Sequence, residues 1–171
     1  MYTRHLLVVV ARGAQVSDGV ADRIAVELGR AGLDVELAPP ASVGSLDRYD
    51  AVVLGSELVD GRWHVDARAL AQRIRDEAPT VPLWLFSSHR SGHPSHPRDR
   101  RSEADELAAR TGAREHREFA AAAHGRRAAV AEAPGAGVPT VESTGRGVSG
   151  GEPGIAAWAA SIAEQLRLAA T

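Results

Sequence analysis

Five short apolar runs along the chain have the pattern of buried β-strands. The run at residues 5–11 is continuously apolar and rich in valine, which is typical of a strand covered on both faces of a parallel sheet. Residues 49–55 and 81–86 are predicted strands of the same kind, Asp-Val-Glu-Leu at residues 34–37 is a further predicted strand, and a weaker one spans residues 117–121. The sequence therefore predicts five strands.

Helical periodicity separates these runs. Apolar positions three and four residues apart predict helices around residues 20–28, 67–74, 104–108 and 155–166. Gly32, Pro79 and Gly112 follow the first three and mark their ends. Residues 124–153 are rich in Ala, Gly, Pro and Arg and have little periodicity, so we expect an irregular segment there that is longer than most connections.

The alternation of strands and helices predicts an α/β fold, with residues 1–171 forming one domain. The expected architecture is an open, doubly wound parallel sheet with helices on both faces. Ligands of such sheets bind beyond the carboxyl ends of the strands. Three loops begin at those ends, at residues 12–17, 56–63 and 87–101, and they are the candidate site.

Composition narrows the possible chemistry. The chain has no cysteine and no lysine, which excludes disulfides, thiolate metal sites, Schiff-base chemistry and a phosphate-loop lysine. The formal net charge of -2 provides no global attraction for nucleic acid or an anionic membrane, so we expect neither as a partner. The apolar run near the N-terminus is too short for a transmembrane segment, and we expect a cytoplasmic protein.

The predicted strands and loops resemble those of flavodoxin-domain proteins. The likeness is carried by residues 8–11, 20–25, 49–56, 61–63 and 84–88, covers most of residues 1–121 and returns in the last helix. The most similar branch is that of the quinone-dependent protoporphyrinogen oxidases. The resemblance implies a flavodoxin-like sheet of five strands in the order 2-1-3-4-5, with noncovalent FMN at the switch between the first and third strands.

The resemblance also implies which residues hold FMN. The first loop would bind the phosphate through backbone N–H groups, with Arg12 adding charge, although it has one hydroxyl where the family has several. The alternative is an ordinary turn before a helix. Trp63 either stacks on the isoalloxazine ring or belongs to the core, and Val59 occupies a position that is often aromatic in the family. The implied contacts are Arg12, Gly13, Ala14, Gln15, Val16 and Ser17 at the phosphate, and Ser56, Val59, Gly61, Trp63, Ser87, Ser88 and His89 around the ring.

Other motifs are less specific. His89, His93 and His96 are ligands that suit zinc, copper or nickel, but the glycine and prolines between them favour a solvated polar loop. The G-x-G-x-x-G match at residues 145–150 has no second strand after it, and the G-x-S-x-G match at residues 147–151 has no downstream histidine. We therefore expect no metal site and assign no catalytic side chain.

These inferences favour an FMN-binding electron-transfer protein or oxidoreductase. The cofactor would carry the chemistry, and the partner would be a redox protein or a small-molecule electron donor or acceptor. Two alternatives stay open. One is a flavodoxin-fold binding or regulatory module that has lost FMN, and the other is a protoporphyrinogen or quinone oxidoreductase.

Overall fold

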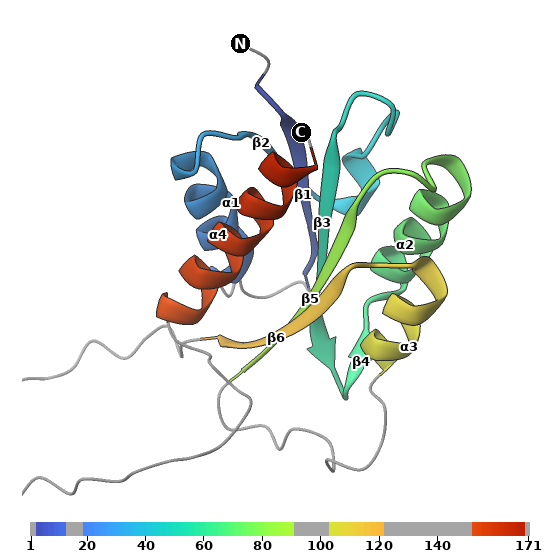
Figure 1. Ribbon diagram of the computed structural model, residues 1–171. Helices are drawn as coiled ribbons and strands as arrows, with labels where there is room; N and C mark the ends of the chain where they lie inside the picture. The colour runs from blue at the N-terminus through green and yellow to red at the C-terminus, as the bar shows by residue number, and fades with distance from the viewer. Residues whose placement is uncertain (1–2, 13–18, 91–102, 122–151, 170–171) are drawn as a thin grey trace, which may run out of the picture.

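A computed structural model of the chain describes residues 3–12, 19–90, 103–121 and 152–169 (Figure 1). Strands and helices alternate along these residues, as the apolar runs predict. The elements are β1 (His5–Ala11), α1 (Val20–Arg30), β2 (Asp34–Ala38), the short 3-10 helix η1 (Pro40–Ser42), β3 (Ala51–Val59), β4 (Arg62–Trp63), α2 (Val65–Glu77), β5 (Leu83–Arg90), α3 (Glu103–Thr111), β6 (Glu115–Ala121) and α4 (Glu152–Leu168).

Five parallel strands form the main sheet, in the order β2-β1-β3-β5-β6. The order reverses between β1 and β3, where Leu6 pairs with Ala51 and Val9 pairs with Leu54. The two-residue strand β4 pairs antiparallel with the end of β3. With β4 set aside, this is the 2-1-3-4-5 order, and the predicted doubly wound α/β sheet is confirmed.

Both faces of the sheet are covered, which explains why the central strands are continuously apolar. Helices α1 and α4 lie on one face, and α2 and α3 lie on the other (Figure 1). Successive side chains of β1 alternate between the two cores, so that Leu6 and Val8 pack with α1 and α4 while Leu7 and Val9 pack towards α2. The two cores fix the strand register, because a shift of one residue would exchange all of these side chains between the faces.

A close approach in the sheet requires the glycine at position 55. A Cβ atom built on Gly55 would lie 2.0 Å from Cζ of Phe86 on the neighbouring strand β5. The Phe86 ring therefore occupies the space that any larger residue at position 55 would need. Phe86 in turn packs edge-on against Trp158 of α4, with ring centroids 6.3 Å apart.

Several boundaries differ from the sequence-based expectation. Strand β3 continues to Val59 and β5 continues to Arg90, so residues expected in the second and third loops belong to the sheet. Asp60 and Gly61 connect β3 to β4 with φ values of 51° and 74°, the positive angles that a two-residue hairpin requires. Residues 122–151, most of the expected irregular segment, lie outside the described residues, and residues 152 and 153 belong to α4.

Among the described residues, the longest apolar helix falls short of what a membrane crossing needs.

Candidate functional site

The candidate site lies where β1, β3 and β5 end, and the structure describes part of it. Gly13, Ala14, Gln15, Val16 and Ser17, the expected phosphate loop apart from Arg12, lie outside the described residues. The same holds for His93 and His96, so the three-histidine interpretation is not tested. Described side chains of the site belong to Arg12, Ser56, Val59, Trp63, Ser87, Ser88 and His89, together with Gly61.

Arg12 follows directly after β1, and its guanidinium is paired. Nη2 of Arg12 lies 3.1 Å from Oδ2 of Asp22 in the first turn of α1. A phosphate placed beside this guanidinium would also meet the Asp22 carboxylate, because the two groups are in hydrogen-bond contact. The charge that Arg12 offers an anion is therefore partly neutralised by its neighbour.

Ser56 is fully buried and ties the hairpin to the start of α2. Its hydroxyl donates to the carbonyl of Glu57 at 2.9 Å and accepts from the backbone N–H of His64 at 2.9 Å. Both bonds are internal to the protein. Ser56 lies at the predicted place in the sequence, but its side chain serves the hairpin and does not face solvent.

Trp63 is a core residue, so its side chain is not placed to stack on a flavin ring. Its side chain is 2% exposed and packs in the core between the sheet and α2. The indole Nε1–H donates to Oγ of Ser87 at 2.8 Å, and the backbone N–H donates to Oε2 of Glu103 at 3.0 Å. The residue belongs to β4 and does not open the following helix.

A chain of side-chain hydrogen bonds continues from Trp63 through Ser87. Oγ of Ser87 lies 2.8 Å from Nε2 of His116, and Nδ1 of His116 lies 2.9 Å from Oδ1 of Asp105. An indole N–H only donates, so a consistent assignment has the Ser87 hydroxyl donating to Nε2 and the His116 Nδ1–H donating to the Asp105 carboxylate. Every group in the chain then has a partner.

Serine, histidine and aspartate in this order have the connectivity of a nucleophilic triad. A nucleophile has to reach its substrate, however, and Ser87 is 1% exposed and already bonded to Trp63. The chain instead connects four elements, because its members lie on β4, β5, β6 and α3. We therefore interpret it as a structural tie beneath the carboxyl edge of the sheet.

The remaining predicted ring contacts are divided between core and surface. Ser88 is fully buried, and its hydroxyl has no hydrogen-bond partner within the described residues. Nδ1 of His89 lies 3.2 Å from Oε1 of Glu118 on β6. Val59 is 53% exposed, and Gly61 forms the tip of the β3–β4 hairpin. The structure thus leaves Val59 and Gly61 at the surface and places the three serines inside.

An isoalloxazine ring gains most from an aromatic face beside it. Each Phe, Tyr and Trp side chain among the described residues is at most 5% exposed: Tyr49, Trp63, Trp84, Phe86, Phe119 and Trp158. This part of the chain therefore offers no aromatic surface for stacking. With Ser56, Ser87 and Ser88 also inside, the described residues do not fit the ring contacts that the resemblance implies.

Sequence reasoning missed three members of this network. Glu103 and Asp105 contribute its carboxylates and His116 its imidazole, and none was a candidate residue. Glu103 also binds Arg68 of α2, with Oε1 2.9 Å from Nη1. Alternation on the predicted strand at residues 117–121, extended one residue back, would have placed His116 on the same face as Glu118.

Comparison with known proteins supports the fold and leaves the ligand open. No protein-family model matches the chain, and neither does any curated protein. Among solved structures, a flavodoxin from the domain Archaea superposes with a TM-score of 0.60 at 14% identity, covering 95% of this chain and 99% of that one. A cysteine-to-serine mutant of flavodoxin from Pseudomonas aeruginosa gives 0.57 at 18% identity, with the same coverage of both chains. A flavodoxin from Streptococcus pneumonia TIGR4 gives 0.51 at 15% identity and covers 96% of this chain and 97% of that one.

At these identities the likeness shows a flavodoxin-like fold, and the protoporphyrinogen oxidase branch stays a prediction.

Proposed function

We propose that this chain is a binding or regulatory module that has kept the flavodoxin-like sheet but does not hold FMN. One observation carries the proposal. Trp63 and Ser87, which the resemblance implies beside the flavin ring, are bonded to each other inside the core at 2.8 Å. A ligand at the carboxyl edge would meet neither side chain.

Moving these side chains out of the core to contact a flavin would cost more free energy than the new contacts would contribute. Removing the ring of a buried tryptophan from a core costs roughly 3–5 kcal/mol, whereas stacking of two aromatic rings contributes roughly 0.5–1.5 kcal/mol. At the other end of the expected ligand, the phosphate would approach Arg12 beside the Asp22 carboxylate. Both considerations favour a module that works without the cofactor.

An FMN-binding electron-transfer protein is the second candidate, and two observations favour it. The fold matches flavodoxins over nearly the whole length of both chains. Arg12 also stands directly after β1, where the resemblance implies the phosphate. Its partner would then be a redox protein or a small-molecule electron donor or acceptor.

Titration of FMN with the purified protein separates the two candidates. We expect FMN to keep its full fluorescence and its absorption spectrum unchanged up to a large molar excess of protein. Quenching that saturates at one FMN per chain would overturn the proposal. In that event Arg12→Ala provides the matched test, since weakened FMN binding in that variant would assign the phosphate to the end of β1.

A further inference from the structure

A recess lies at the same edge of the sheet, towards β2. It is a cleft of about 450 Å³ at the carboxyl ends of β1 and β2, closed on its sides by η1 and the start of α2. This volume is within the range of roughly 300–1,000 Å³ that is typical of small-molecule sites. Among the implied FMN contacts that the structure describes, Arg12 alone lines it.

One wall of the cleft is apolar and stiff. It is formed by Leu37, which is 39% exposed, and by Pro39 and Pro40. Proline has a fixed φ and few conformations to lose, so such a wall accepts a flat apolar body at a small entropic cost. A heterocyclic ring fits this surface better than a long flexible chain would.

The polar side chains among the described residues of the cleft are a guanidinium, an imidazole and two carboxylates. They belong to Arg12, His64, Asp22 and Asp66. Arg12 is bonded to Asp22 through Nη2, while its buried Nε–H has no hydrogen-bond partner within the described residues. Nδ1 of His64 lies 3.5 Å from Oδ2 of Asp66.

This set of groups suits a neutral ligand. The two carboxylates exceed the single guanidinium in charge, so a phosphate or another strong anion is repelled. The Arg12 side chain is 33% exposed, so its guanidinium can donate to an acceptor on the ligand, and ligand hydroxyl or N–H groups can donate to the carboxylates. The ligand should therefore carry both an acceptor and donors on a flat, uncharged body.

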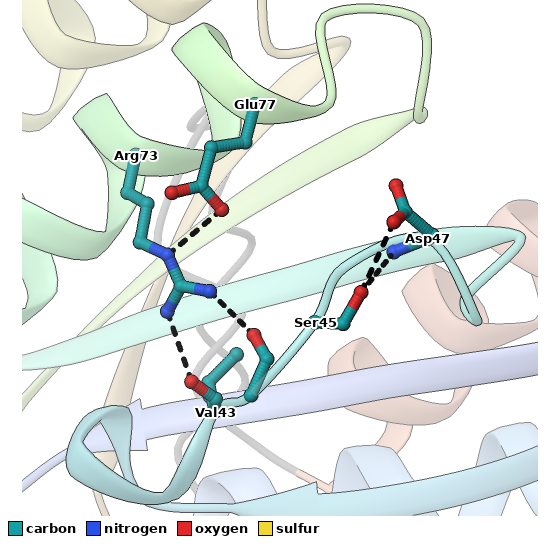
Figure 2. A network of polar contacts seen from close by, with 6 residues as sticks. Val43, Ser45, Asp47, Arg73 and Glu77 are labelled. Atoms are coloured by element: carbon teal, nitrogen blue, oxygen red, sulfur yellow. Dashed lines mark hydrogen bonds and ion pairs between the residues drawn. The ribbon is translucent and has the colours of Figure 1, made fainter.

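Helix α2 holds both sides of the cleft in place. At its start, the backbone N–H of His64 is bound by the buried Ser56 hydroxyl at 2.9 Å. Two turns later, Arg73 reaches across to the segment that follows η1 (Figure 2). Its guanidinium donates to the carbonyl of Val43 at 2.9 Å and to the carbonyl of Gly44, and Nε is 3.0 Å from Oε2 of Glu77. The cleft is thus formed before any ligand arrives, which lowers the cost of binding.

We propose that this cleft binds an uncharged nucleoside or free nucleobase. The inference rests on the proposed function as a binding module and names the class of its ligand. The flat base would lie against the proline wall, a ring acceptor would meet Arg12, and base or sugar donors would meet Asp66.

Saturation-transfer NMR on the full chain tests the proposal, with adenosine, guanosine, cytidine and uridine as probes. At least one nucleoside should give a saturating signal. Ala41→Phe, at an exposed lining position, should abolish the signal by filling the cleft, whereas Ala109→Phe at an exposed position on α3 should not. Asp66→Asn should raise the Kd about tenfold, and the control Asp76→Asn on the same helix should leave it unchanged.

The expected repulsion of a phosphate by the two carboxylates is tested with the 5′-monophosphate of the nucleoside that binds most tightly. We expect it to bind more weakly than the nucleoside. Equal or tighter binding of the monophosphate, no signal from any nucleoside, or a signal that survives Ala41→Phe would each overturn the inference. The FMN titration tests the proposed function separately from the nucleoside assays. FMN binding together with nucleoside loss in Ala41→Phe would refute the proposed function alone, and silence in both assays would refute this inference alone.

Discussion

Replacing Ser87 with alanine tests whether the Trp63–Ser87–His116–Asp105 chain is structural. The substitution removes the acceptor of the Trp63 indole N–H and the partner of Nε2 of His116, which lie 2.8 Å and 2.8 Å from Oγ. A buried polar group left without a partner costs roughly 1–3 kcal/mol. Trp63 is 2% exposed and the His116 side chain 9% exposed, so water replaces neither bond well. The expected loss in the free energy of unfolding is about 2–5 kcal/mol.

Urea denaturation followed by far-ultraviolet circular dichroism measures this loss. Ser45→Ala is the matched control, because Ser45 is an exposed serine bonded to Asp47 at 3.1 Å (Figure 2), and its loss should cost less than about 1 kcal/mol. In a Trp63→Phe background the cost of Ser87→Ala should fall by about 1–3 kcal/mol, since the orphaned indole is gone. If Ser87→Ala lowers the free energy of unfolding no more than Ser45→Ala does, the hydrogen bonds from Trp63 to Asp105 do not stabilise the fold, and the reasoning is refuted.

Three further predictions concern other parts of the fold. Gly55→Ala should destabilise the protein by about 1–3 kcal/mol in urea, because the new methyl overlaps the Phe86 ring; an unchanged midpoint would contradict the close approach. Arg73→Met should cost about 1–2 kcal/mol by freeing two loop carbonyls, and a neutral result would mean that they are solvated equally well. Burial, and then hydrogen bonding to Glu36, raises the pKa of Tyr49 above 10.0, so the stability from its neutral phenol is lost as pH rises through that raised pKa. Absorbance titration of phenolate, with the other tyrosine replaced by phenylalanine, should place the Tyr49 midpoint above 10.0 and lower it in Glu36→Gln; a midpoint at or below 10.0 would contradict this.

The sheet could be predicted from the sequence because its signal is strong and local. Residues 5–11 and 51–55 are apolar at nearly every position, which is the pattern of strands with a core on each side. The strand order followed from the family resemblance, and the structure has that order. The last helix was equally clear, since Ile155, Trp158 and Ile162 share one buried face.

The ends of β3 and β5 were harder to predict, because the polar side chains there are buried. Ser56, Ser87 and Ser88 looked like loop residues, yet each is at most 1% exposed. Two of the three have partners supplied by other segments of the chain, such as His116 for Ser87. A single sequence does not specify such pairs, so side chains that were assigned to a ligand proved to belong to the interior.

The β3–β4 hairpin is predictable from the residues of its turn. Asp60-Gly61 is a typical two-residue hairpin turn, and it lies between Val59 and Arg62, which pair across it. Applying that rule would have placed Trp63 on a strand. Its side chain could then have been assigned to the sheet face on which Leu54 and Leu85 lie.

The most direct test of the account is the state of the Trp63 indole with and without FMN. In a 15N-labelled sample, the indole signal that disappears in Trp63→Phe should exchange slowly with solvent and should not shift when FMN is added in large excess. This is the behaviour of a group sealed in the core and bonded to Ser87. Rapid exchange, or a shift that saturates with FMN, would place the ring at the ligand and contradict the account.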